Sequence, residues 1–276
     1  MLGLKRTILV GFALCSMAAF ALGGCSDSEA PGTLRVSMVD APLIESGVEA
    51  VMVTFSSIRV HRNDDAEAGE DGWIEIMGAE TAVEDRTFNV LELVNGVSAL
   101  LGEQLLEAGT YTQIRIIVES ATVRVDGVDK ELTIPSGQQT GIKLVGNFTI
   151  ESEEITDLLL DFDVEQSVRN LGNGDWEMRP TIRVVPVVLS GSISGVVLPV
   201  GSNAVVNVYA AGSADLVTTT QVDALTGEFM VKGLLAGTYD IQIVAEGFSL
   251  ATVSGVTVTA GAETEASGVT LVAIGS

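Results

Sequence analysis

Apolar and polar residues alternate along most of the first two thirds of the chain. The alternation is clearest in three runs, at residues 34–38, 51–55 and 112–118. A period of two places one row of side chains in a core and the other in water, which is typical of antiparallel sheets. Clusters of Gly, Asn, Asp and Pro separate the runs, as turns require. Residues 97–106 are the exception, because they favour a short helix that would end before Gly109.

The composition changes near residue 190. Beyond it Val, Ala, Gly and Thr dominate, acidic residues become rare, and short alternating runs continue to the end. A segment of this size matches a small seven-stranded sandwich. The whole chain has 276 residues, which suits two domains. We therefore predict an all-β fold of two tandem antiparallel β-sandwiches, at residues 33–189 and 190–276.

The first 24 residues predict a signal peptide. Two cations, Lys5 and Arg6, precede an apolar stretch. At about 15 residues this stretch is too short to span a bilayer comfortably. It leads into a motif that resembles the end of a bacterial lipoprotein signal, Leu22-Gly23-Gly24-Cys25.

The lipoprotein resemblance implies that Cys25 becomes the first residue of the mature chain and carries lipid on its thiol. Such lipid holds a protein to a membrane without a spanning segment. Residues 25–32 then form a short polar tether. Ser26 after the cysteine favours the outer membrane by the same resemblance, so we expect a protein anchored in the bacterial envelope.

Three stretches of the second segment, at residues 204–209, 226–229 and 233–240, carry a further resemblance. They are similar to the carboxypeptidase regulatory-like domain, a prealbumin-like seven-stranded sandwich. The resemblance implies an accessory module without catalytic residues.

The first segment resembles the bacterial domain of unknown function 4382. The matching stretches include residues 34–42, 108–115 and 160–163, in the expected order. The resemblance implies a domain of anchored surface lipoproteins and carries no reaction. Ala-Gly-Thr-Tyr at residues 108–111 recurs at residues 236–239, which predicts that both sandwiches use the same turn into a strand.

The charge narrows the possible functions. The chain has 14 Lys and Arg against 37 Asp and Glu, a net charge of −23. This balance argues against nucleic-acid binding, which depends on cations that contact phosphates. One His and two Cys exclude a His/Cys zinc cage and a disulfide framework. No motif requires a cofactor, so we expect none, apart from Ca²⁺ in the site considered next.

The sharpest candidate site consists of Asp161, Asp163 and Glu165. On a strand these three carboxylates would line one face. Oxygen-rich clusters suit Ca²⁺ or Mg²⁺, and Asp40 could add a ligand if its turn lies nearby. Two alternatives stay open, a solvated outer face and a catalytic carboxylate pair acting on glycans.

The acidic loop at residues 62–72 is a weaker candidate, and we expect it to be a flexible hairpin tip. His61 precedes this loop, and we expect an exposed histidine at a strand end. Trp73 and Trp176 either pack against the sandwich or offer a platform to a sugar. No Gly-x-Ser-x-Gly motif follows the signal peptide.

These observations favour a non-enzymatic, lipid-anchored envelope protein with a binding or scaffolding role. Its partners would be the membrane, through Cys25, and a surface glycan or another envelope protein. The alternative functions are binding of a divalent cation or a carbohydrate by the first domain, and a carboxylate-dependent glycan hydrolase.

Overall fold

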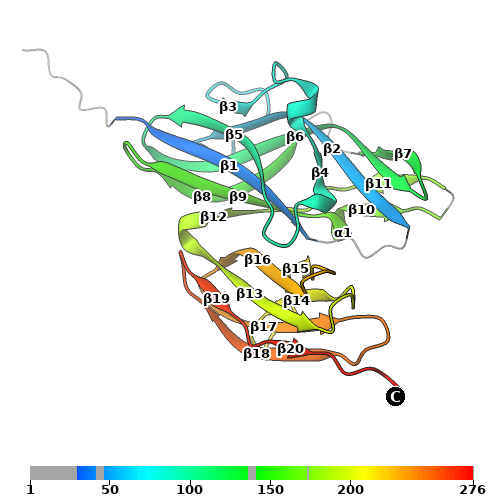
Figure 1. Cartoon of the computed structure of the whole chain (residues 1–276). Helices are drawn as coiled ribbons and strands as arrows, with labels where there is room; N and C mark the ends of the chain where they lie inside the picture. Colours follow the sequence, from blue (N-terminus) through cyan, green and yellow to red (C-terminus); the bar gives the residue numbers. More distant parts are fainter. Residues whose placement is uncertain (1–29, 42–46, 136–140, 173, 276) are drawn as a thin grey trace, which may run out of the picture.

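The computed structural model describes residues 30–41, 47–135, 141–172 and 174–275, and Cys25 lies outside them. The first domain consists of two packed sheets (Figure 1). The smaller sheet has the strand order β12-β9-β1-β5. Its strands are β1 (Gly32–Ala41), β5 (Ala99–Leu106), β9 (Ile155–Asp163) and β12 (Ile182–Pro186).

The larger sheet has eight strands in the order β10-β11-β7-β6-β2-β3, with β4 beside β2 and β8 beside β6. These strands are β2 (Val48–His61), β3 (Ile74–Met77), β4 (Thr87–Asn89), β6 (Gly109–Val125), β7 (Val128–Thr133), β8 (Ile142–Ile150), β10 (Val168–Asn170) and β11 (Trp176–Met178). Short helical turns connect some of them: η1 (Val83–Arg86), η2 (Val90–Glu92), α1 (Val164–Ser167) and η3 (Val187–Leu189). Between the sheets lie the largest buried side chains, among them Tyr111, Phe55 and Phe162.

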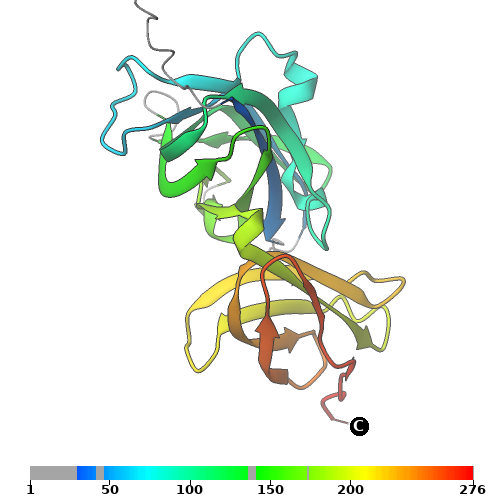
Figure 2. The ribbon, with the colours of Figure 1, turned by 90° about the vertical axis from the view of Figure 1, so that its left-hand side faces the viewer.

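The second domain is also a sandwich and stacks below the first (Figure 2). One sheet has the order β16-β13-β19 with β20 beside β13, and the other has the order β15-β14-β17-β18. The strands are β13 (Ser190–Leu198), β14 (Val205–Ala210), β15 (Leu216–Gln221), β16 (Glu228–Leu235), β17 (Gly237–Val244), β18 (Ala251–Val258), β19 (Glu263–Glu265) and β20 (Val269–Thr270). Its core is separate from that of the first domain.

The predicted all-β sandwich architecture is confirmed, with one refinement in strand direction. Most neighbours are antiparallel, but four pairs are parallel: β1 with β9, β7 with β11, β13 with β19 and β13 with β20. A parallel pair needs a long crossover connection rather than a hairpin. The alternation within a single strand does not reveal the direction of pairing, because it reports which side chains are buried and not which strand lies beside it.

The predicted helix at residues 97–106 is wrong, since this segment forms β5. Leu101 and Leu106 are buried, whereas Leu100 and Leu105 are more than half exposed. The strand pairs antiparallel with β1 and completes the smaller sheet. Tertiary pairing therefore overrides the helix propensity of this Leu- and Glu-containing segment.

The repeated Ala-Gly-Thr-Tyr sequence produces the same contact in both domains, as predicted. Tyr111 donates its hydroxyl hydrogen bond to the carbonyl of Glu107, at 3.1 Å. Tyr239 donates to the carbonyl of Leu235, at 2.7 Å. In both cases the acceptor lies four residues before the tyrosine, just ahead of the start of β6 or of β17. Each ring anchors the turn that precedes its strand.

Candidate functional site

The three predicted carboxylates do not line one strand face. The strand β9 ends at Asp163, and α1 begins at Val164, so the period of two stops there. Asp163 instead caps α1, accepting hydrogen bonds from the backbone N–H of Gln166 at 3.0 Å and from its side-chain amide at 2.6 Å. Glu165 lies on α1 and is exposed. The strand-face prediction for this trio is therefore wrong.

Asp161 faces away from the core of its own domain and is nevertheless only 6% exposed. It pairs with Arg183 of the neighbouring strand β12, with 2.6 Å between Oδ2 and Nη2. Thr218 of the second domain also contacts it by a hydrogen bond. Burial raises the pKa of Asp161 above its usual value, and the charge of Arg183 opposes that rise.

Asp40 lies near the end of β1, opposite Phe162 in the register with β9. Its Oδ1 accepts a hydrogen bond from the backbone N–H of Val164, at 3.0 Å, and the side chain is buried. Asp40 therefore holds the beginning of α1 in place. Its own backbone N–H donates to the carbonyl of Leu93, at 2.9 Å, which attaches the turn after η2 to β1.

Three of the four predicted ligands, Asp40, Asp161 and Asp163, thus make separate structural contacts, and Glu165 is exposed on α1. Among the described residues, no group of three or more His, Cys, Asp or Glu side chains is arranged to hold a metal ion. The Ca²⁺ site predicted at Asp40, Asp161, Asp163 and Glu165 is not assembled. A glycan has no access to Asp161 either, because the second domain covers it.

Two of the four predicted residues, Asp40 and Asp161, lie where the two domains meet. A small hollow between them is lined by residues of both, including Asp40 and Asp161 from the first and Thr218 and Lys232 from the second. Lys232 donates to the carbonyl of Gly96. We call this set of contacts the domain interface.

Further contacts extend the domain interface. The backbone N–H of Asn95 donates to Oγ1 of Thr220, at 3.0 Å. Gly96 beside it has φ +80°, and a Cβ there would come within 2.7 Å of the Met230 sulfur. Glycine at position 96 therefore allows these two segments of the chain to approach this closely. An apolar group formed by Val39, Leu159 and Val185 lies next to these polar contacts.

Sequence reasoning missed Lys232 as an interface residue. One signal was present: Lys232 is the single cation beyond residue 190, in a segment with seven acids. An isolated cation at an alternating strand position is a candidate for a specific partner. The partner, a backbone carbonyl 136 residues away, leaves no local sequence pattern.

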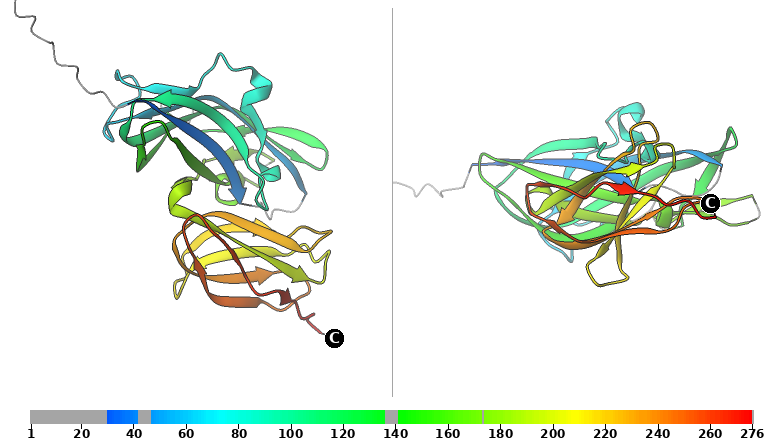
Figure 3. Two further views of the ribbon diagram at one scale, coloured as in Figure 1. Left: turned by 60° about the vertical axis from the view of Figure 1, so that its left-hand side comes forward. Right: turned by 60° about the horizontal axis from the view of Figure 1, so that its bottom comes forward.

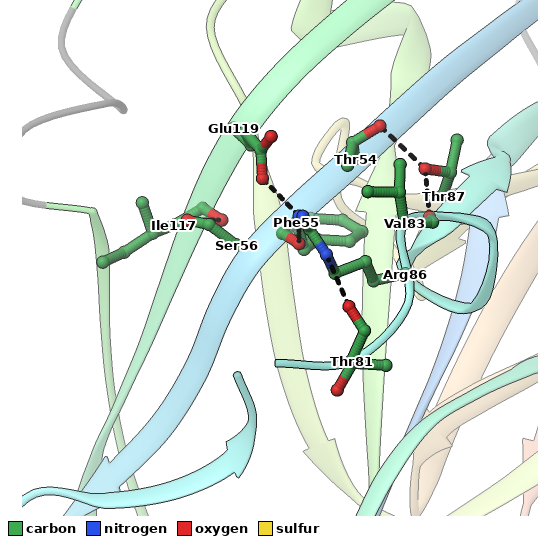
Figure 4. Close-up of polar contacts among 9 residues, drawn as sticks. All are labelled: Thr54, Phe55, Ser56, Thr81, Val83, Arg86, Thr87, Ile117 and Glu119. Atoms are coloured by element: carbon green, nitrogen blue, oxygen red, sulfur yellow. Dashed lines mark hydrogen bonds and ion pairs between the residues drawn. The ribbon is translucent and has the colours of Figure 1, made fainter. Parts of the chain in front are cut away.

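A second buried charge lies inside the first domain (Figure 4). Arg86, at the end of η1, is only 5% exposed. It donates to the carbonyls of Phe55, at 2.8 Å, and Thr81, at 3.1 Å, and forms an ion pair with Glu119 of β6. The pairing of β2 with β6 shifts register on both sides of Phe55, and Arg86 binds at this irregularity.

The acidic loop at residues 62–72 is mostly exposed, as expected of a hairpin tip, but its centre folds back on the larger sheet. Ala66 at its centre is fully buried, and its carbonyl accepts from the side chains of Gln113 and Arg115, both at 3.2 Å. His61 lies at the end of β2 as predicted, but it is only partly exposed, with its ring 5.0 Å from that of Trp73.

Trp176 packs into the core of the first domain and is 2% exposed. It therefore offers no platform to a sugar. Trp73 is partly buried and donates from Nε1 to the carbonyl of Glu67, at 2.9 Å, so it fastens the acidic loop.

These observations define an all-β chain of two sandwich domains that meet at a partly polar, buried interface. No helix in the described part of the chain is long and apolar enough to cross a membrane. A family model described as "Domain of unknown function (DUF4382)" matches residues 31–180, more than half of the chain. The chain therefore belongs to this family, as the motifs in its first segment predicted.

No curated protein matches the chain. Among solved structures, a type II cohesin–X-dockerin complex from Acetivibrio cellulolyticus is similar at 23% identity and a TM-score of 0.24, and it covers 30% of this chain. The match spans 58% of that structure's chain. The minor pilin GBS52 of Streptococcus agalactiae is 10% identical over 88% of this chain and 97% of its own, with a TM-score of 0.24. A putative cell adhesion protein from Bacteroides fragilis is 9% identical over 88% and 95%, with a TM-score of 0.22.

Proposed function

We propose that this chain is a lipid-anchored, non-enzymatic protein of the bacterial cell envelope, placed in the outer membrane. The observation that carries the proposal is the motif Leu22-Gly23-Gly24-Cys25, which ends only seven residues before β1 begins at Gly32. A lipid on Cys25 would hold the first domain close to the membrane. The second domain, which resembles a carboxypeptidase regulatory-like module, would be held by the first.

The structural contacts made by the candidate site residues support a binding or scaffolding role. Asp161 is paired with Arg183 under the second domain, and Asp163 caps a helix. A carboxylate in such a contact is poorly placed for acid–base work on an external substrate, because catalysis needs a group that the substrate can reach. The partner of such a module would be a surface glycan or another envelope protein, and the acidic surface disfavours nucleic acid.

Membrane fractionation tests the proposed anchor. Replacing Cys25→Ala removes the thiol that would carry lipid, so the protein should move from the membrane fraction to the soluble fraction. Replacing Cys15→Ala is the matched control, because Cys15 lies within the predicted signal peptide and should leave the anchor intact. Labelled palmitate should be incorporated into the wild type and the Cys15→Ala variant, and not into the Cys25→Ala variant. A Cys25→Ala variant that stays in the membrane fraction would overturn the proposal.

A further inference from the structure

Large aliphatic side chains gather on the surface around the linker between the two domains. The turn η3 buries none of its three residues, and Val188 is 74% and Leu189 55% exposed. Ile155 at the start of β9 is 53% exposed and lines the same pocket as η3. Leu235 at the end of β16 is also exposed, and the N–H of the next residue donates to the carbonyl of Leu189, at 3.3 Å. We call Ile155, Val187, Val188, Leu189 and Leu235 the linker patch.

The chain enters the first domain beside the linker patch. Thr33 donates its backbone N–H to the carbonyl of Glu154, at 2.8 Å, and the carbonyl of Pro31 accepts from Glu153, at 3.1 Å. Glu151 and Glu154 line the pocket that the linker patch also lines. In Figures 1 and 3 (left panel) the start of β1 and the turn between β12 and β13 lie on the same side of the molecule.

The tether fixes how far this side can lie from a bilayer. Five residue steps lead from Cys25 to Ala30, the first described residue. Fully extended, they reach at most about 18 Å. A lipid on Cys25 therefore keeps Ala30, on the side of the molecule that carries the linker patch, within about that distance of the membrane.

We propose that the linker patch is the surface with which the mature protein rests on the bilayer, an inference that depends on the proposed lipid anchor. Single exposed aliphatic residues are normal on any surface. Here they come from three separate elements and meet on the side where the chain enters the first domain, and larger exposed apolar patches mark interaction sites.

Acidic side chains define the kind of lipid surface that fits. Glu151, Glu153 and Glu154 are exposed in the turn between β8 and β9, beside the patch. Their charge repels anionic headgroups at short range. The surface therefore suits zwitterionic lipid, and an anionic bilayer would need divalent cations between headgroups and carboxylates.

A fluorescent label at a single cysteine tests the proposal in the lipidated mature chain. Val188→Cys is labelled with an environment-sensitive dye, and the protein is placed on phosphatidylcholine vesicles. The mature chain carries no other free thiol, because Cys25 would be acylated and Cys15 removed with the signal peptide. Leu225→Cys is the matched control: Leu225 is 88% exposed and lies in the turn before β16, at the opposite end of that strand from Leu235.

The outcomes separate the anchor from the orientation. The proposal expects that the dye at position 188 shifts its emission to shorter wavelength and is quenched by brominated lipid, while the dye at position 225 does neither. If the protein floats with the vesicles but position 188 stays in water, the patch proposal is overturned and the anchor stands. If the protein does not float, the anchor is overturned, and the patch proposal with it. A shift at position 188 without vesicles that grows with protein concentration identifies a second copy as the occupant and also overturns the proposal.

A second arm tests the contribution of the three glutamates. Vesicles that contain phosphatidylglycerol should give a smaller emission shift at position 188 than phosphatidylcholine vesicles, and Mg²⁺ should restore it. An equal shift on both vesicles in the absence of divalent cations would overturn the role assigned to the three glutamates in selecting the lipid.

Discussion

The two sandwiches share a turn and differ in how they use charge. Tyr111 and Tyr239 make the same hydrogen bond to a carbonyl four residues earlier. The first domain holds 11 of the 14 Lys and Arg residues, and its buried polar contacts include the Arg86–Glu119 and Arg183–Asp161 pairs. The second domain has one cation, Lys232, which binds a carbonyl of the first. A sandwich of this kind can therefore form without internal ion pairs.

The comparison assigns different sources of stability to the two domains. In the second, carboxylates such as Asp223 accept hydrogen bonds from backbone N–H groups of their own turns, at 2.8 and 2.9 Å. In the first, buried cations satisfy backbone carbonyls at irregular points of the sheet. Because both tryptophans, Trp73 and Trp176, lie in the first domain, their fluorescence reports that domain selectively, while circular dichroism reports both.

The largest effect is expected from Arg86→Met. The change leaves two buried carbonyls and one carboxylate without their donor, which costs about 2–4 kcal/mol of unfolding free energy. Tryptophan fluorescence in urea should show the loss in the first domain. Arg124→Met is the control, because it breaks only an exposed pair with Asp129 and should change stability little. An equal effect of the two variants would contradict the structural role of Arg86.

A smaller, matched effect is expected from the two tyrosines. Tyr111→Phe and Tyr239→Phe each remove one hydroxyl and one hydrogen bond, and each should cost about 1 kcal/mol. The first variant should shift the fluorescence transition. The second should shift the part of the circular dichroism transition that fluorescence does not follow. A loss in only one domain would show that the shared turn does not do the same work in both.

The smallest expected effect is a pH dependence of stability, which has opposite signs for Asp161 in the first domain and Asp223 in the second. The folded pKa of Asp161 is raised by burial, so the wild type should lose stability relative to Asp161→Asn as pH rises from about 4 through that raised pKa. The pKa of Asp223 is lowered by the backbone N–H groups of Thr226 and Leu225. The wild type should therefore gain stability relative to Asp223→Asn as pH rises through the lowered folded pKa toward about 4. Urea midpoints over a pH series measure both slopes, and slopes of the same sign would contradict this assignment.

The sequence predicts the strands and the sandwich class well, because alternation directly reports one buried and one exposed face. In β9, for example, Phe162 lies on the opposite side of the strand from Asp161 and is buried in the core. The prediction fails at β5, where pairing with β1 decides the structure. The parallel partner of β1 was equally out of reach, since β9 lies more than a hundred residues away.

For the candidate site, the sequence predicts the orientation of Asp161 but not the domain that covers it. Asp161 does face outward from its own domain, as the alternation indicated. A solvated face or a cation site followed from treating the domain by itself. The structure places Thr218 and its neighbours over that face, and contacts between residues so distant in sequence leave no periodic signal. Glu165 was misplaced because α1 begins one residue before it.

The central claim is that the outward side of β9, with Asp161, packs against the second domain, and amide hydrogen exchange at Asn95 tests this domain interface most directly. The N–H of Asn95 donates to Thr220 across the domain interface, and Lys232 binds the carbonyl of the next residue. The account predicts that this amide is protected in the wild type and loses protection in Lys232→Met. In the exposed control Lys143→Met, and at core amides such as that of Ile241, protection should stay unchanged. A wild-type Asn95 amide that exchanges as fast as an unprotected one, while both cores remain protected, would contradict the claim.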